Sequence, residues 1–164
     1  MTMKAGFAAA ALAALAACAM GDRPAPDPSF FVIRHLHKDV GQDPGLTAQG
    51  LECARRLATM LEGRGVTAVY VSTTRRARET GAPFAAAAGI SAQEYAPADI
   101  AGLAARAQTE AGSVLIVGHS NTVPDIVERL GGTRPGPIDE SRFGEVWQVA
   151  RRGGTTATSR IPGC

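Results

Sequence analysis

The chain has 164 residues, of which 45% are hydrophobic and 20% charged, and its formal net charge at pH 7 is +2. This composition is typical of one globular domain and excludes a disordered, collagen-like or coiled-coil chain. The basic residues form no block, which argues against a nucleic-acid surface or a polybasic membrane anchor. Cys18, Cys53 and Cys164 are too few and too dispersed for a disulfide scaffold or a CxxC zinc site.

The N-terminus predicts an exported protein. Lys4 is followed by an uncharged, alanine-rich stretch over residues 5–17, which is too short to span a bilayer but suits the apolar region of a signal peptide. It ends in Leu15-Ala16-Ala17-Cys18, which resembles the lipobox of bacterial lipoproteins. That resemblance implies cleavage before Cys18 and lipidation of its thiol and new amine. The lipids would anchor the protein to a membrane, with the protein facing the periplasm or the cell exterior. An ordinary secretory signal with an incidental cysteine is the alternative.

A proline-rich segment follows this signal. Residues 18–28 include Pro24, Pro26 and Pro28 and show no apolar periodicity, which predicts an extended tether. The folded domain is therefore expected to occupy residues 29–164.

Predicted strands and helices alternate along this domain. Residues 30–33 form a continuous run of aromatic and β-branched side chains, which predicts a strand buried on both faces. Thr47 stands where it can cap an amphipathic helix over residues 48–62. Further strands are expected over 68–72, 113–117 and 145–149, and further helices over 75–88, 99–111 and 122–130. The order predicts an α/β fold with three layers, in which helices cover both faces of a mainly parallel sheet.

Basic side chains stand at the ends of three predicted strands. Arg34 and His35 follow the first strand, Arg76 opens the helix after the second, and His119 follows the strand over 113–117. Ligands bind such sheets beyond the carboxyl ends of the strands, so we expect these side chains to gather there. Arginines bind phosphate oxygens in bidentate fashion. An imidazole between arginines has a lowered pKa, which leaves a nitrogen lone pair able to attack phosphorus.

Four motifs in register resemble the histidine phosphatase superfamily, which includes phosphoglycerate mutase-like enzymes and small phosphohistidine phosphatases. They are Arg34-His35-Leu36 for RHG or RHA, Leu46-Thr47-Ala48-Gln49-Gly50 for LTxxG, the segment from Ser72 to Thr80 for SxxxRAxQT, and Val117-Gly118-His119-Ser120-Asn121-Thr122 for VGHSNT. The resemblance covers residues 30 to about 150. It implies a phosphoglycerate mutase-like fold and hydrolysis of a small phosphomonoester or a phosphoprotein, without metal or cofactor.

The same resemblance implies a role for each matched residue. His35 is the nucleophile that carries the phosphoryl group, Arg34 and Arg76 clamp the phosphate, and His119 donates to the phosphoryl oxygens. Arg76 is chosen over Arg75 because it directly precedes Ala77. The family's general acid lies after the helix over 75–88, where Asp99 is favoured over Glu94.

Two residues depart from the family's pattern. Leu36 replaces a small residue after the nucleophile, and His37 replaces an acidic or amide residue. We expect a bulkier and less acidic rim around the site. A non-catalytic lipoprotein that binds a phosphorylated or anionic ligand is therefore an alternative. A zinc hydrolase with His35, His37 and His119 as ligands is another, although the neighbouring arginines oppose a cation.

The remaining polar residues of these segments have structural interpretations. Caps and turn residues are expected at Thr47, Ser72, Thr80 and Asn121, and solvated surface charges at Lys38 and Arg142. Cys53 lies on the predicted helix and is expected in the core, so it and Cys164 are predicted to be free thiols, although an exported protein can form a disulfide.

Overall fold

The computed structural model describes residues 27–164. The predicted signal peptide, the lipidation site Cys18 and almost all of the tether lie outside the described residues. The strands are β1 (Ser29–Arg34), β2 (Val66–Ser72), β3 (Gln93–Tyr95), β4 (Ser113–Gly118), β5 (Glu145–Ala150) and β6 (Thr156–Arg160). The helices are α1 (Ala48–Leu61), α2 (Arg75–Ala88), α3 (Ile100–Thr109) and α4 (Val123–Arg129).

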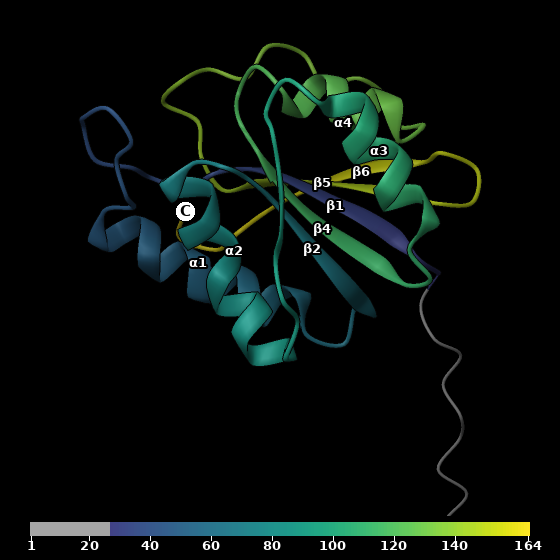
Figure 1. The fold of residues 1–164 in the computed structure, drawn as a ribbon, viewed down its shortest axis with the longest axis horizontal. Helices are drawn as coiled ribbons and strands as arrows, with labels where there is room; N and C mark the ends of the chain where they lie inside the picture. The colour runs from purple at the N-terminus through teal and green to yellow at the C-terminus, as the bar shows by residue number, and fades with distance from the viewer. Residues whose placement is uncertain (1–26) are drawn as a thin grey trace, which may run out of the picture.

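The strands form one six-stranded sheet in the order β3-β2-β4-β1-β5-β6. Neighbours from β3 to β1 are parallel, whereas β5 runs antiparallel to β1 and β6 antiparallel to β5. Helices α1 and α2 cover one face of the sheet and α3 and α4 the other (Figure 1). The expected three-layer α/β fold with a mainly parallel sheet is confirmed.

Successive side chains of the central strand β1 belong alternately to the two apolar clusters of the core. Phe31 and Ile33 belong to the apolar cluster that includes the buried residues of α1 and α2. Phe30 and Val32 belong to the second cluster, which includes those of α3 and α4. A strand covered on both faces needs apolar residues at every position, which is why its sequence is an unbroken apolar run.

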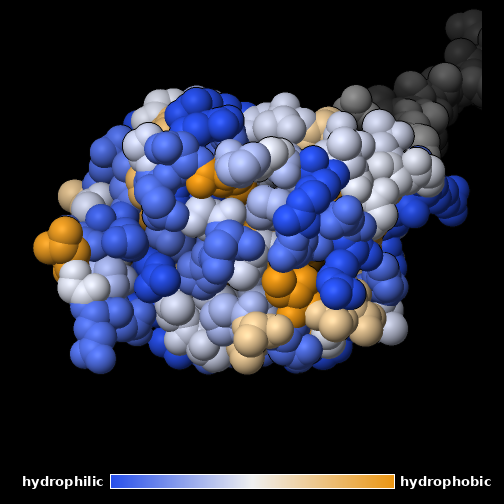
Figure 2. Space-filling model, turned by 90° about the horizontal axis from the view of Figure 1, so that it is seen from above, coloured by the Kyte–Doolittle hydropathy of each residue, from blue (hydrophilic) through white to orange (hydrophobic). Residues whose placement is uncertain are grey.

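The polar residues lie mainly on the outside of these layers. Figure 2 shows that the face above α3 and α4 is largely hydrophilic, with small separate hydrophobic patches. Among the described residues, Val40 and Leu51 are the large hydrophobic side chains that are exposed. In the described range, no helix combines the length and the apolar character needed to cross a membrane.

The expectation of two free thiols is wrong. Cys53 is buried in α1, as expected, but it forms a disulfide with Cys164, with the two Cα atoms 6.0 Å apart. Strand β6, which was not predicted, runs antiparallel to β5 and returns the end of the chain to α1. There Arg56 Nη1 also donates to the carbonyl oxygen of Pro162 over 2.8 Å.

Candidate active site

The structure brings Arg34, His35, Arg76 and His119 together at the carboxyl ends of the parallel strands. The register pairs Arg34 with Gly118, and the His35 amide donates to the Gly118 carbonyl oxygen over 2.9 Å. The imidazoles of His35 and His119 therefore meet edge-on, with ring centroids 5.4 Å apart. Arg76, in the first turn of α2, places Nη2 3.4 Å from His119 Nδ1. We call these four residues the basic cluster.

His35 is held as a neutral imidazole with one free nitrogen. Its Nδ1 lies 2.9 Å from the carbonyl oxygen of Leu36. Since a carbonyl only accepts, Nδ1 carries the hydrogen and Nε2 keeps its lone pair. Burial, together with the charges of Arg34 and Arg76, lowers the pKa of His35 to about 3. At neutral pH this side chain is therefore available as a nucleophile.

His119 uses both ring nitrogens within the protein. Nε2 lies 2.8 Å from Ser72 Oγ, while Nδ1 faces Arg76. An arginine only donates, so Nδ1 is the acceptor and Nε2 carries the hydrogen given to Ser72. Burial and the charges of Arg76 and Arg34 lower the pKa of His119 to about 4. Donation from Nδ1 to a phosphoryl oxygen requires a second proton, which a bound dianion favours. Ser72, expected to be a turn residue, thus orients the ring.

Arg34 is almost wholly buried, at 2% exposure, and is fixed by the segment before β5. Its Nη1 donates to the carbonyl oxygens of Asp139, Glu140 and Arg142 over 2.9–3.0 Å. Its Nη2 donates to Glu140 Oε2 over 2.5 Å, and the ring of Phe143 lies 4.2 Å from the guanidinium carbon. These contacts fix the plane of the guanidinium and leave Nε without a hydrogen-bond partner among the described residues.

Two donors of the basic cluster have no partner within residues 27–164. They are the Nε–H groups of Arg34 and Arg76, and both are buried. A buried donor left unpaired costs about 1–3 kcal/mol, so a ligand that accepts from both donors would be favoured here. The donors are cationic, and the charges of both arginines act on His35. An anion with several oxygens, such as a phosphoryl group, fits this arrangement.

Arg75 and Arg76 have different surroundings. The Arg75 side chain is 64% exposed and pairs with Glu79, with Nε 2.7 Å from Oε1. Arg76 is 20% exposed and turns toward His119, with Asp43 Oδ1 3.6 Å from its Nη1. Only the second arginine is therefore placed to bind an anion in the cluster.

Neither carboxylate expected as a general acid is brought to the basic cluster. Asp99 caps α3, where its Oδ1 accepts from the Gly102 amide over 2.9 Å. Glu94 pairs with Arg78, with Nε 2.6 Å from Oε1. Among the described residues, neither forms a hydrogen bond or ion pair with the four cluster residues.

Glu140 contacts the cluster at Arg34, as Asp43 does at Arg76. It binds Arg34 through Oε2, and Ser120 Oγ donates to its Oε1. The hydrogen bond from Ser120 and the charge of Arg34 lower the pKa of Glu140, against the opposing effect of burial. Nothing in the sequence marks Glu140 as a site residue, because it lies in a segment without helix or strand periodicity, where no local pattern separates it from surface carboxylates.

The expectation of a bulkier rim is wrong for Leu36. Its side chain is fully buried in the core, and its amide donates to Thr80 Oγ1 over 3.0 Å. His37 stacks on Phe143, with ring centroids 4.3 Å apart. Within the part of the chain that the structure describes, no three His, Cys, Asp or Glu side chains are grouped as a metal site requires. The geometry therefore gives the zinc alternative no support.

The residues expected to be structural are placed as follows. Thr47 caps α1, with the Gly50 amide 3.1 Å from its Oγ1. Lys38 is partly exposed and lies next to Asp39. The side chain of Arg142 pairs with Glu145 at the surface, while its carbonyl oxygen holds Arg34.

Comparisons with known proteins agree with this geometry. A sequence model of the histidine phosphatase superfamily (branch 1) matches residues 36–97. The structure is similar to that of the protein histidine phosphatase SixA complexed with tungstate, at 22% identity and a TM-score of 0.60, covering 80% of this chain and 94% of that one. It is also similar to a putative phosphohistidine phosphatase SixA from Nakamurella multipartitia, at 22% identity and a TM-score of 0.59, over 86% of this chain and 100% of that one.

A third similar structure is a putative α-ribazole-5′-P phosphatase from Escherichia coli, at 16% identity and a TM-score of 0.59, over 83% of this chain and 96% of that one. No curated protein sequence matches the chain. At these identities the structural likenesses show the fold, which is that of the phosphoglycerate mutase-like histidine phosphatases. The sequence match indicates a similarity to the histidine phosphatase superfamily over residues 36–97.

Proposed function

We propose that this chain is a histidine phosphatase that hydrolyses a phosphomonoester, or a phosphorylated protein side chain, through a phosphohistidine formed on His35. One observation carries the proposal: the free Nε2 of His35 lies in a cluster with two buried, unpaired arginine Nε–H groups. A nucleophile and cationic donors are what in-line transfer of a phosphoryl group needs.

The first step transfers the phosphoryl group to the enzyme. The Nε2 lone pair attacks phosphorus, the bond from phosphorus to the ester oxygen breaks, and the leaving group takes the electron pair. Arg34 and Arg76 neutralise the phosphoryl oxygens, through charge-assisted hydrogen bonds worth about 1.5–3 kcal/mol each. The positive charge that develops on the imidazole is stabilised by the Leu36 carbonyl oxygen, which accepts from Nδ1.

The second step releases phosphate. A water oxygen attacks the phosphorus, the phosphorus–nitrogen bond breaks, and its electron pair returns to Nε2. The water protons pass to the released phosphate and to solvent, and the proposed route uses no metal or cofactor. Because Asp99 and Glu94 are engaged elsewhere, the leaving group departs with little acid assistance, which favours substrates with good leaving groups.

The test is to trap the intermediate. Brief reaction with an aryl phosphate should label the wild-type protein with acid-labile phosphate, and His35→Ala or His35→Asn should lose both the label and turnover, by a factor on the order of a thousand or more. His37→Asn is the matched control, because this neighbouring histidine lies on Phe143. Undiminished turnover in the His35 variants would overturn the covalent mechanism, and loss of activity with chelators would overturn its metal independence.

The same aryl phosphate assay distinguishes a phosphatase from the non-catalytic alternative. A lipoprotein that only binds an anionic ligand would bind vanadate or phosphate but would release no phenol from an aryl phosphate. Its sequence basis, the departures at Leu36 and His37, is weaker now that Leu36 packs in the core.

The proposal for location is export followed by lipid anchoring at Cys18. It is supported by the resemblance of Leu15-Ala16-Ala17-Cys18 to a lipobox. The disulfide between Cys53 and Cys164 is also characteristic of an oxidising compartment outside the cytoplasm. In this arrangement the domain over residues 29–164 faces the periplasm or the cell exterior.

A further inference from the structure

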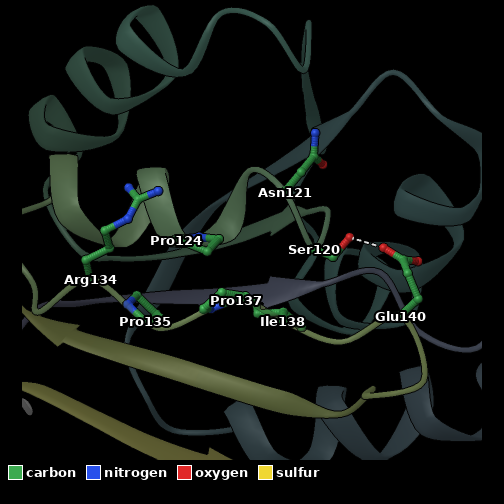
Figure 3. Close-up of a pocket in the computed structure, with 8 residues that line it drawn as sticks. All are labelled: Ser120, Asn121, Pro124, Arg134, Pro135, Pro137, Ile138 and Glu140. Carbon is green, nitrogen blue, oxygen red and sulfur yellow. Dashed lines mark hydrogen bonds between the residues drawn. The ribbon is translucent and has the colours of Figure 1, made fainter.

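A pocket of about 400 Å³ adjoins the basic cluster, between the start of α4 and the segment before β5. Figure 3 shows its lining, with Ser120 and Glu140 at one end and Arg134 at the other. Between these ends lie Pro124, Pro135, Pro137 and Ile138. The volume is in the range of small-molecule sites, which span about 300–1,000 Å³.

The pocket and the basic cluster share a wall. Ser120 directly follows His119 in the chain, and its hydroxyl donates to Glu140 Oε1. The other oxygen of that carboxylate accepts from Arg34 Nη2. A phosphoryl group held by the cluster therefore has this pocket beside it, where the organic part of an ester can lie.

We propose that this pocket binds the leaving group of the substrate, and that the leaving group is compact, apolar or aromatic, and free of negative charge. The proposal rests on the proposed phosphatase function and specifies its substrate class.

The apolar preference follows from the lining. Three prolines contribute ring surface and no amide hydrogen, so they give a polar leaving group few partners. Their fixed φ angles also keep the wall rigid, which reduces the entropy lost on binding. The Ser120 hydroxyl is already committed to Glu140. A flat ring packed against prolines is the ligand that such a surface accommodates.

The charge preference follows from the Arg134 end. Arg134 is bound by both Asp125 and Glu128, so two carboxylates outweigh its single positive charge. At the other end the Glu140 carboxylate is balanced by its ion pair with Arg34. A leaving group whose far end carries a carboxylate or second phosphate therefore meets net negative charge near Arg134, whereas an ammonium group meets attraction there.

Three aryl phosphates of similar size test the charge preference. We expect kcat/KM for 4-carboxyphenyl phosphate to be at least about tenfold below that for phenyl phosphate, and kcat/KM for 4-(aminomethyl)phenyl phosphate to equal or exceed it. Glu128→Gln, which removes one of the two carboxylates around Arg134, should narrow the gap between the carboxylated and the unsubstituted substrate. Equal values for the three substrates in the wild type would overturn the proposal.

A second variant tests the position of the pocket. Asn121 is an exposed side chain in its lining, so Asn121→Trp should obstruct the pocket. We expect it to lower kcat/KM for phenyl phosphate about tenfold or more and to leave inhibition by vanadate, which fills only the phosphoryl site, unchanged. Gln108→Trp is the matched control, an exposed amide at the end of α3. Unchanged turnover of phenyl phosphate by Asn121→Trp would place the leaving group elsewhere.

Failure of the phosphatase function is distinguishable from failure of this proposal. If no substrate labels His35, the phosphatase function is wrong, and calorimetric binding of phenylphosphonate against 4-carboxyphenylphosphonate still tests the pocket. Tighter binding of phenylphosphonate, weakened by Asn121→Trp, would support it, and equal binding would overturn it. If His35 is labelled equally by all three phosphates, only the pocket proposal fails.

Discussion

His35 donates its Nδ1 hydrogen to the carbonyl oxygen of its own chain neighbour, Leu36, over 2.9 Å. This hydrogen bond blocks one ring nitrogen, so the phosphoryl group can form a bond only with Nε2. We predict that the trapped intermediate is the Nε2-phosphohistidine, identified by phosphorus–nitrogen couplings in NMR spectra of labelled protein. Phosphate on Nδ1 would show that the imidazole ring of His35 flips before it reacts.

Arg76 and Arg75 form a matched pair for testing the anion site. Arg76→Ala should weaken vanadate or phosphate binding about 10- to 100-fold, the equivalent of one charge-assisted contact of about 1.5–3 kcal/mol. Arg75→Ala, which removes an exposed partner of Glu79, should leave binding unchanged. The measurement is the rise in melting temperature with ligand concentration. Equal losses in the two variants would mean that the wrong arginine has been assigned.

Stability should depend on pH through the buried histidines. The pKa values of His35 and His119, about 3 and about 4, lie below the ordinary value of 6.5. Below pH 6.5 the unfolded chain therefore binds protons that the folded chain does not, so the free energy of unfolding falls as the pH falls toward 4. Each histidine contributes at most about 1.4 kcal/mol per pH unit.

Urea unfolding between pH 7 and pH 5 measures this effect above the range in which the carboxylates titrate. His119→Asn should reduce the slope of unfolding free energy against pH, whatever its effect on stability at pH 7. A free energy of unfolding that is constant over this interval would contradict the lowered pKa values.

The disulfide should stabilise the domain without serving the site. Reduction, or Cys164→Ser, should lower the free energy of unfolding by about 2–4 kcal/mol, because the cross-link closes a long loop in the unfolded chain. Vanadate binding by the folded protein should be unchanged, since the bond lies against α1. The Cys164→Ser variant is also the control, because a reductant should not destabilise it further. Loss of vanadate binding on reduction would show that the disulfide is needed to position the basic cluster.

Lipid attachment is tested at Cys18. Cys18→Ser should prevent palmitate labelling and detergent partitioning, and a fragment that starts at Ser29 should retain phosphatase activity, because the tether separates the anchor from the domain. A wild-type protein that is exported, carries no label and partitions into the aqueous phase would show that the lipobox match is accidental.

The sequence predicted those parts of the fold that a local pattern encodes. β1 and β4 are visible as apolar runs because both faces are covered, and α1 is visible through its periodicity and its cap at Thr47. β6 has the sequence TATSR and is largely exposed at the sheet edge, so it has no buried face to leave a pattern. β3 has only three residues, too few to show alternation.

The candidate site likewise contains residues that the sequence marks and features that it does not. The positions of Arg34, His35 and His119 follow from strand ends that the sequence marks, and Arg76 from the start of a helix. Glu140 and the disulfide depend on contacts between distant segments, Glu140 with Arg34 and Cys53 with Cys164. No spacing rule along one segment reports such contacts, so these features required the three-dimensional structure.

The position of β1 in the sheet sets an order of assembly during synthesis. The strand lies between β4 and β5, so the first folded segment to leave the ribosome finds its hydrogen-bonding partners only when residues 113–118 and 145–150 have been made. Pairings of such long range are slow to form. Until then the run over residues 30–33 stays exposed and is a natural target for chaperones.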